Sequence, residues 1–273
     1  MVARSLSVVL VACLVWAGTC TAAGSPSDDL TQGGVLRVAV PDRADPPFVL
    51  YGPDGRPDGY DPAVARTLAA ALGSESVLVP VPGGRAGVLA AVEDGRAQLG
   101  LARLSVDLDA ARRVTLSRPY AAPRRALLYN RLGLAHAAPG EPPHRLLERS
   151  GTTVAVACDD LTGGYLSEAF PAVRPLPLDD LDAAAEAVRR GQAAAILGDR
   201  PRLLHWLAGH PGLGLELGYW ELPEARDALV IAVPWQAERL AGWLDTALEI
   251  LEGDGTLPSL RARYLEPAGG GSP

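Results

Sequence analysis

The chain has 273 residues, 48% of them hydrophobic, so it is long enough to bury one large core or two smaller ones. Its formal net charge of −7 argues against a nucleic-acid-binding surface. All 25 basic residues are arginines, which we interpret as a coding bias rather than as chemistry.

The first 23 residues have the pattern of a signal peptide. Arg4 precedes the apolar run 5–18, which is too short to span a bilayer, and small residues then offer a cleavage site near Ala23. Cys20 opens a second alternative, lipidation of the exported chain, and both alternatives stay open. No later segment is long and apolar enough for a membrane span. We therefore expect an exported protein, either periplasmic or held at the cell surface as a lipoprotein.

Between a tether at 24–33 and a disordered tail at 267–273, strand-like apolar runs alternate with helical patterns. This alternation predicts an α/β fold with largely parallel sheets. Strands are expected at 35–40, 76–81, 97–102, 126–130, 152–158, 192–199 and 228–234. Helices are expected at 61–73, 87–95, 178–191, 236–252 and 257–264, with a helical turn at 108–114.

The helix expected at 61–73 has the clearest start. Asp61 is a good N-cap residue, and Pro62 suits the first helical position because its missing N–H would have no partner there. Gly73 can end the helix. Tyr60, directly before the cap, has two interpretations: a packing residue, or a ring that faces a ligand.

The element order predicts two lobes. The first lobe takes residues 34–124, the second 125–224, and residues 225–266 return to the first lobe and close the chain. Two crossings between the lobes make a hinge, and a hinge between two sheets makes a cleft. Ligands of open α/β sheets bind beyond the carboxyl ends of the strands, so we expect the site in that cleft.

Four motifs in this order resemble a known family. They are "GVLRVAVPDRADPPFVLYGPDGRPDGYDPAVARTLAAALG", "AVEDGRAQLGLARLSVDLDAARRVTLSRPY", "AAILGD" and "LEGDGTLPSLRARYL". Together they resemble the bacterial extracellular solute-binding proteins of family 3, the polar amino-acid receptors of ABC importers. The resemblance implies a two-lobed periplasmic-binding-protein type 2 fold with a ligand cleft between the lobes.

The resemblance also implies site residues. Tyr60 falls where the family places an aromatic ring over the ligand. Ser105 falls where a hydroxyl meets a ligand carboxylate. Asp199 falls where the second lobe binds the ligand's ammonium group, although "DRPRLLHWL" also reads as an N-cap and a helix. In the first loop, Asp42 and Asp45 lie near ligand contacts, with Phe48 beside them, although loop aspartates often form turns.

Two departures from the family pattern concern charge. The arginine that clamps the ligand carboxylate in "T-x-T-x-x-R" falls on Ala110, and Arg112 and Arg113 follow on another side of the helix. Arg103 stands where the family usually has Gly, so it either supplies the cation from another side or blocks the pocket. Asp159 and Asp160 stand where the family has a Gly-Thr-rich loop. They have two interpretations: carboxylates that stabilise the start of a helix, or site residues that would favour a cationic ligand.

Three functional outcomes follow from this charge pattern. In the first, Arg103 replaces the lost arginine and the ligand is an amino acid. In the second, the ligand is an amine or another cation. In the third, the site has decayed and the protein is a docking or signalling partner. We expect no enzyme, no cofactor and no metal, and a monomer that binds a small polar solute and an ABC permease. An accessory protein of a periplasmic dehydrogenase and a cyclohexadienyl dehydratase-like enzyme are the alternatives.

Overall fold

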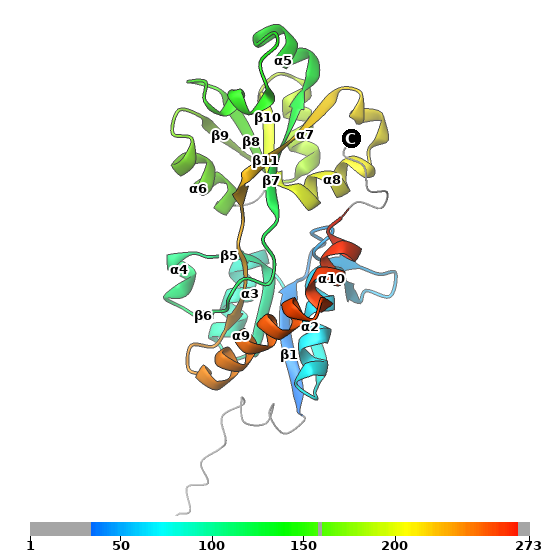
Figure 1. The fold of residues 1–273 in the computed structure, drawn as a ribbon, viewed down its shortest axis with the longest axis vertical. Coiled ribbons are helices and arrows are strands. Elements are labelled where there is room, and N and C mark those ends of the chain that lie inside the picture. Colours follow the sequence, from blue (N-terminus) through cyan, green and yellow to red (C-terminus); the bar gives the residue numbers. More distant parts are fainter. Residues whose placement is uncertain (1–33, 158–159, 267–273) are drawn as a thin grey trace, which may run out of the picture.

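The computed structural model describes residues 34–157 and 160–266, which form two lobes joined by two extended segments (Figure 1). Each lobe contains one five-stranded sheet with helices packed on it. The predicted α/β, two-lobed fold is confirmed. The predicted signal peptide, tether, lipidation site and tail lie outside the described residues, and the domain boundaries stay predictions.

The sheet of the first lobe has the strand order β4-β1-β5-β12-β6. β1 pairs in parallel with β4 and β5, whereas β12 runs antiparallel to β5 and β6. Because β12 follows the whole second lobe in sequence, the chain crosses between the lobes twice. The strands are β1 (Val35–Pro41), β4 (Glu75–Val81), β5 (Leu99–Ser105), β6 (Thr115–Leu116) and β12 (Leu229–Val233).

Alternate residues of β1 enter the cores on opposite faces of this sheet, as the pleat of a strand requires. Leu36, Val38 and Val40 belong to one core, and Ala39 belongs to the other. The first core is covered by α2 (Tyr60–Ala71), α9 (Glu238–Gly253) and α10 (Thr256–Tyr264), the second by α3 (Gly84–Glu93). The lobe also holds the hairpin β2 (Leu50–Tyr51) and β3 (Pro57–Asp58), and the short helix α4 (Leu108–Ala111).

The second lobe repeats the plan with the strand order β11-β7-β10-β8-β9. Its strands are β7 (Arg124–Asn130), β8 (Thr153–Ala157), β9 (Arg174–Leu178), β10 (Ala195–Asp199) and β11 (Leu217–Arg226). Its helices are α5 (Arg131–Ala137), α6 (Asp160–Ala169), α7 (Leu181–Arg189) and α8 (Arg200–Ala208), with short 3₁₀ helices at Pro143–Leu147 and Pro211–Gly214. The predictions did not include β9, β11 or α5.

The two segments that join the lobes bond to each other. Tyr120 N donates to Leu229 O at 2.9 Å, and Leu229 N donates to Ala121 O at 2.9 Å. Asp227 N donates to Pro123 O at 3.0 Å. The hinge is therefore a short two-stranded ladder rather than two independent linkers. Among the described residues, no helix has the length and apolar character of a membrane span.

The predicted cap of α2 is wrong by two residues. The helix begins at Tyr60, and Gly59 is its N-cap residue, with φ of 107° and no side-chain bond. Tyr60 N and Asp61 N donate to Pro47 O and Phe48 O, so the incoming loop satisfies these helix-start donors. These two backbone carbonyls thus take the capping role that the sequence analysis gave to the Asp61 carboxylate. A side chain at position 59 would collide with the same loop.

Asp61 is instead a buried acid in the first turn of α2. Its side chain is fully buried and accepts a bond from the Tyr120 hydroxyl at 2.6 Å and one from Arg103 N at 3.3 Å. Burial raises the pKa of Asp61 to about 7, against the opposing effect of the Tyr120 hydrogen bond. The folded chain therefore holds a proton on Asp61 more firmly than the unfolded chain does.

We expect Gly59→Ala to lower the free energy of unfolding by about 2–4 kcal/mol, because its Cβ would lie 2.6 Å from Phe48 O on a positive-φ backbone. Gly55→Ala is the matched control, since Gly55 has φ of 73° but open space around it, and should cost about 1 kcal/mol. Urea unfolding followed by circular dichroism measures both. Equal losses in the two variants would contradict the collision.

We expect Asp61 to make the protein less stable as the pH rises from about 4 to about 7. Its pKa is higher in the folded than in the unfolded chain, so unfolding releases a proton in this window. The free energy of unfolding therefore falls by up to about 4 kcal/mol across the window. Asp61→Asn should remove that part of the pH dependence. The measurement is the free energy of unfolding of both proteins at several pH values. Parallel curves for the two proteins would show that Asp61 does not titrate in this window.

Candidate functional site

The residue at the centre of the candidate site is Arg103, near the end of β5. Between the pairs Val230–Leu104 and Ala232–Gly100, β5 holds three residues where β12 holds one, so β5 bulges there. Arg103 has φ of 47°, the only positive φ of a non-glycine residue in the described part of the chain. Such backbone is costly and is found where a side chain must be aimed.

The side chain of Arg103 crosses from the first lobe to the second. Its Nε donates to Asp45 Oδ2 at 2.5 Å, and its Nη1 donates to Asp199 Oδ2 at 2.6 Å. Its guanidinium also lies 5.5 Å from the centre of the Phe48 ring. The Arg103 and Asp199 side chains are only 5% and 1% exposed. A cation of the chain therefore already lies against the acid that the resemblance assigns to a ligand's ammonium group.

A second ion pair crosses between the lobes beside the first. Arg202, on α8, places its Nε 2.7 Å from Asp45 Oδ1. Asp199, Arg103, Asp45 and Arg202 thus form a row of alternating charge, with two members from each lobe. We call these four residues the interlobe charge row. In it, each central residue contacts an opposite charge on both sides.

Arg125, at the start of β7, supports Asp199 from within the second lobe. Its Nη1 lies 3.8 Å from Asp199 Oδ1, and its Nη2 lies 3.1 Å from Asp227 Oδ2. Its guanidinium packs on the Tyr165 ring at 4.4 Å. Because Arg125 and Asp227 lie at the two crossings of the hinge, this buried pair ties the hinge to the charge row.

Two predicted ligand contacts lie in the core of the first lobe. Tyr60 and Phe48 are fully buried, with ring centres 6.1 Å apart. Tyr60 stacks on Tyr120 at 5.7 Å, and its hydroxyl donates to Tyr120 O. This geometry favours the packing interpretation of Tyr60. The ligand roles assigned from the sequence stay predictions.

The other predicted residues are dispersed. Asp42 is exposed, and Ser105 is buried with its hydroxyl 3.4 Å from Arg85 Nη2. Ala110 is buried in α4. The Asp160 side chain and Cys20 lie outside what the structure describes. Asp199 does precede α8 as its N-cap residue, but its carboxylate makes no capping bond.

The sequence interpretation missed Arg125, Arg202 and Asp227. Two signals for them exist. Arg202 lies three residues after Asp199, at a spacing that places both on one helix face. Arg125 opens a buried apolar strand, where a charged side chain requires a partner. No signal of this kind marks Asp227.

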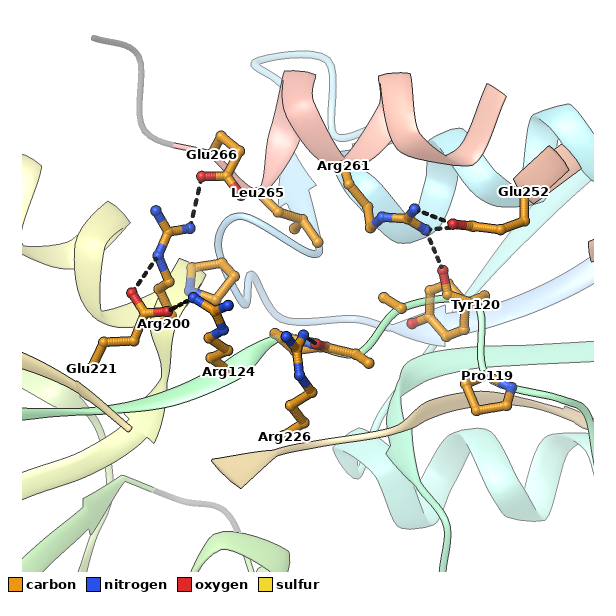
Figure 2. Close-up of a pocket in the computed structure, with 14 residues that line it drawn as sticks. Pro119, Tyr120, Arg124, Arg200, Glu221, Arg226, Glu252, Arg261, Leu265 and Glu266 are labelled. Atoms are coloured by element: carbon orange, nitrogen blue, oxygen red, sulfur yellow. Dashed lines mark hydrogen bonds and ion pairs between the residues drawn. The ribbon is translucent and has the colours of Figure 1, made fainter. Parts of the chain in front are cut away.

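Two hollows lie near the charge row, and a third lies beside the hinge. The cleft-mouth pocket, of about 370 Å³, opens between the loop after β1 and the helices α7 and α8. A hollow of about 620 Å³ lies in the first lobe beside Arg85 and Ser105. The hinge-side pocket, of about 650 Å³, is shown in Figure 2, where Arg124, Arg200 and Arg261 each meet a glutamate. The described residues contain no cluster of side chains suited to a metal ion.

Comparisons with solved structures find the same fold. The putative binding component of an ABC transporter from Wolinella succinogenes, complexed with lysine, is 21% identical, with a TM-score of 0.70, over 86% of this chain and 97% of that one. An ancestral cationic amino acid solute-binding protein is 21% identical, with a TM-score of 0.69, over 89% and 100%. The solute receptor for L-cysteine of Neisseria gonorrhoeae is 21% identical, with a TM-score of 0.66, over 89% and 95%.

Comparison with curated proteins gave no match. The sequence profile of the bacterial extracellular solute-binding proteins, family 3, matches residues 36–267, which is most of the chain. Fold, element order and profile agree over the same residues. This chain therefore belongs to the bacterial extracellular solute-binding proteins of family 3.

Proposed function

We propose that this chain is the exported solute-binding component of an ABC-type importer and that it binds a small polar solute, an amino acid or a related amine. The family supports this proposal, and so do the ligands named for structural neighbours, among them lysine, arginine and L-cysteine. On this proposal the chain is a periplasmic monomer, or a lipoprotein held through Cys20, and its partner is a membrane permease.

The observation that carries the proposal is the charge pattern of the cleft-mouth pocket. Both lobes line it with charges of both signs. The first lobe contributes Arg43, Arg85, Arg103 and Asp45, and the second lobe contributes Asp179, Asp180, Asp182 and Arg202. A zwitterion needs a cation for its carboxylate and an anion for its ammonium group, since an unpaired charge is costly to bury. At about 370 Å³, the pocket is at the small end of the range for ligand sites.

The mechanism follows from the position of this pocket between the lobes. A solute that contacts Arg43 and Asp179 together would contact both lobes only when they are close. It would therefore stabilise the closed arrangement by its differential affinity. A permease that recognises the closed arrangement would then respond to the loaded receptor.

A second candidate is a ligand-deficient accessory or sensory protein of the same fold, such as a partner of a periplasmic dehydrogenase. The ion pair between Arg103 and Asp199 favours it, because that acid is already neutralised by the chain itself. Ala110 favours it too, since no carboxylate clamp stands there.

A cyclohexadienyl dehydratase-like activity has less support. One neighbour is described as an ancestral amino acid-binding protein that is a precursor of such an enzyme. A dehydratase needs an acid of raised pKa in contact with its substrate. Asp61 has a raised pKa, but it is fully buried behind the backbone of Arg103. We therefore propose a binding protein rather than an enzyme.

We expect a thermal-shift screen of amino acids and polyamines to find a solute that raises the melting temperature, since a ligand at 100 times its Kd adds about 2.7 kcal/mol to the stability. Arg43→Ala and Asp179→Asn should each weaken its binding about tenfold, because each removes one charge-assisted contact. Arg96→Ala is the control, because Arg96 pairs with Asp94 at the surface. A screen in which no solute shifts the melting temperature would favour the accessory protein.

A further inference from the structure

The interlobe charge row joins the two lobes through side chains of the chain itself. Asp45 comes from the loop after β1, and Asp199 comes from the carboxyl end of β10 in the other lobe. Both carboxylates contact the same guanidinium, at 2.5 and 2.6 Å. Without a cation between them, two like charges at this separation would repel. The closed arrangement of these lobes therefore depends on a positive group at this point.

Arg103 is held ready for that role by the first lobe alone. Its backbone N–H donates to Asp61, and its carbonyl accepts a bond from Arg85 Nη2 at 3.0 Å. The Phe48 ring borders its guanidinium, and the bulge in β5 sets its direction. A side chain fixed in this way loses little conformational entropy when a second partner arrives. Asp199 can therefore bind it at low cost when the lobes meet.

We propose that Arg103 is a built-in latch: it takes the place of a solute's cationic group between Asp45 and Asp199, and so holds the two lobes together in the unliganded chain. This goes beyond the proposed function and changes its mechanism: Arg103 already holds the lobes together, so a solute adds to the stability of the closed arrangement instead of producing it. It also means that a solute whose ammonium or guanidinium group reaches Asp199 must first displace Arg103.

Other contacts between the lobes are weaker candidates for this role. Arg200 reaches from α8 to Glu266 at 2.8 Å in the hinge-side pocket (Figure 2). This pair is partly exposed, and exposed ion pairs contribute little because water and salt screen them. Arg202 and Asp45 form a more buried interlobe pair, but both of its members are more exposed than Arg103 and Asp199.

Small-angle scattering of the unliganded exported chain tests the latch. The wild type should be compact and should keep its radius of gyration when solutes are added. Arg103→Gly should have a larger radius, because it removes the guanidinium that joins Asp45 to Asp199, and Gly suits the positive φ so that the fold is kept. Arg113→Ala is the matched control, since Arg113 pairs with Glu93 at 2.6 Å within the first lobe, and it should match the wild type.

Chemical rescue adds a second measurement. Guanidinium at low millimolar concentration should return Arg103→Gly to the wild-type radius and raise its melting temperature, because it refills the space between the two carboxylates. It should do neither in the wild type nor in Arg113→Ala. Rescue by guanidinium but not by sodium would identify a cation of this shape, rather than general screening, as what closes the lobes.

Several results would overturn the latch. These are a folded Arg103→Gly variant with the wild-type radius, or a wild type whose radius falls when a solute is added. If Arg103→Gly does not fold, Asp199→Asn takes its place and should also expand the protein. Loss of folding in both variants would count against the proposal, since a latch between lobes leaves each core intact. A failed solute screen would not affect these results, because they concern the unliganded chain.

Discussion

One guanidinium between two carboxylates of different lobes is the interaction on which the rest of this structure depends. Arg103 is almost fully buried, and so is Asp199, so neither charge can be satisfied by water in the closed arrangement. Removing one partner of such a pair leaves a buried, uncompensated charge. The proposed latch therefore couples the arrangement of the lobes to the contacts of Arg103.

The fold brings these groups together through its strand order. Asp45 follows β1, Asp199 ends β10, and both positions lie beyond the carboxyl ends of strands in their own sheets, where α/β folds gather functional side chains. Arg103 joins them only because β5 bulges against β12 and turns its backbone to positive φ. A regular strand would alternate its side chains between the two cores and would not aim one across the gap.

Much of this fold could be predicted from the sequence, because periodicity and turn residues mark α2, β1, β5 and α9 locally. The N-cap of α2 was wrong, since Asp61 has the chemistry of a cap while the bonds come from the loop carrying Pro47 and Phe48. The sequence left Arg103 with two roles open. Choosing between them needs the distance to Asp199, 96 residues away, and no local pattern contains it. For the same reason Asp227 gave no signal before its contact with Arg125 was visible.

The departures at positions 103 and 110 are best understood together. The resemblance places a cation at position 110, for a carboxylate, and leaves position 103 small. This chain has a buried alanine at 110 and a buried arginine at 103, and that arginine contacts Asp199, the acid expected to bind a ligand's ammonium group. A zwitterion would find no carboxylate clamp at position 110, and it would find Asp199 already bound by Arg103. The cleft-mouth pocket offers further charges, Arg43 and Arg85 from the first lobe and Asp179 and Asp180 from the second, beside Asp45, Arg103 and Arg202 of the charge row. If a solute binds to this chain without displacing Arg103, charge balance directs it to this pocket, where Arg103 and Asp45 form part of the wall.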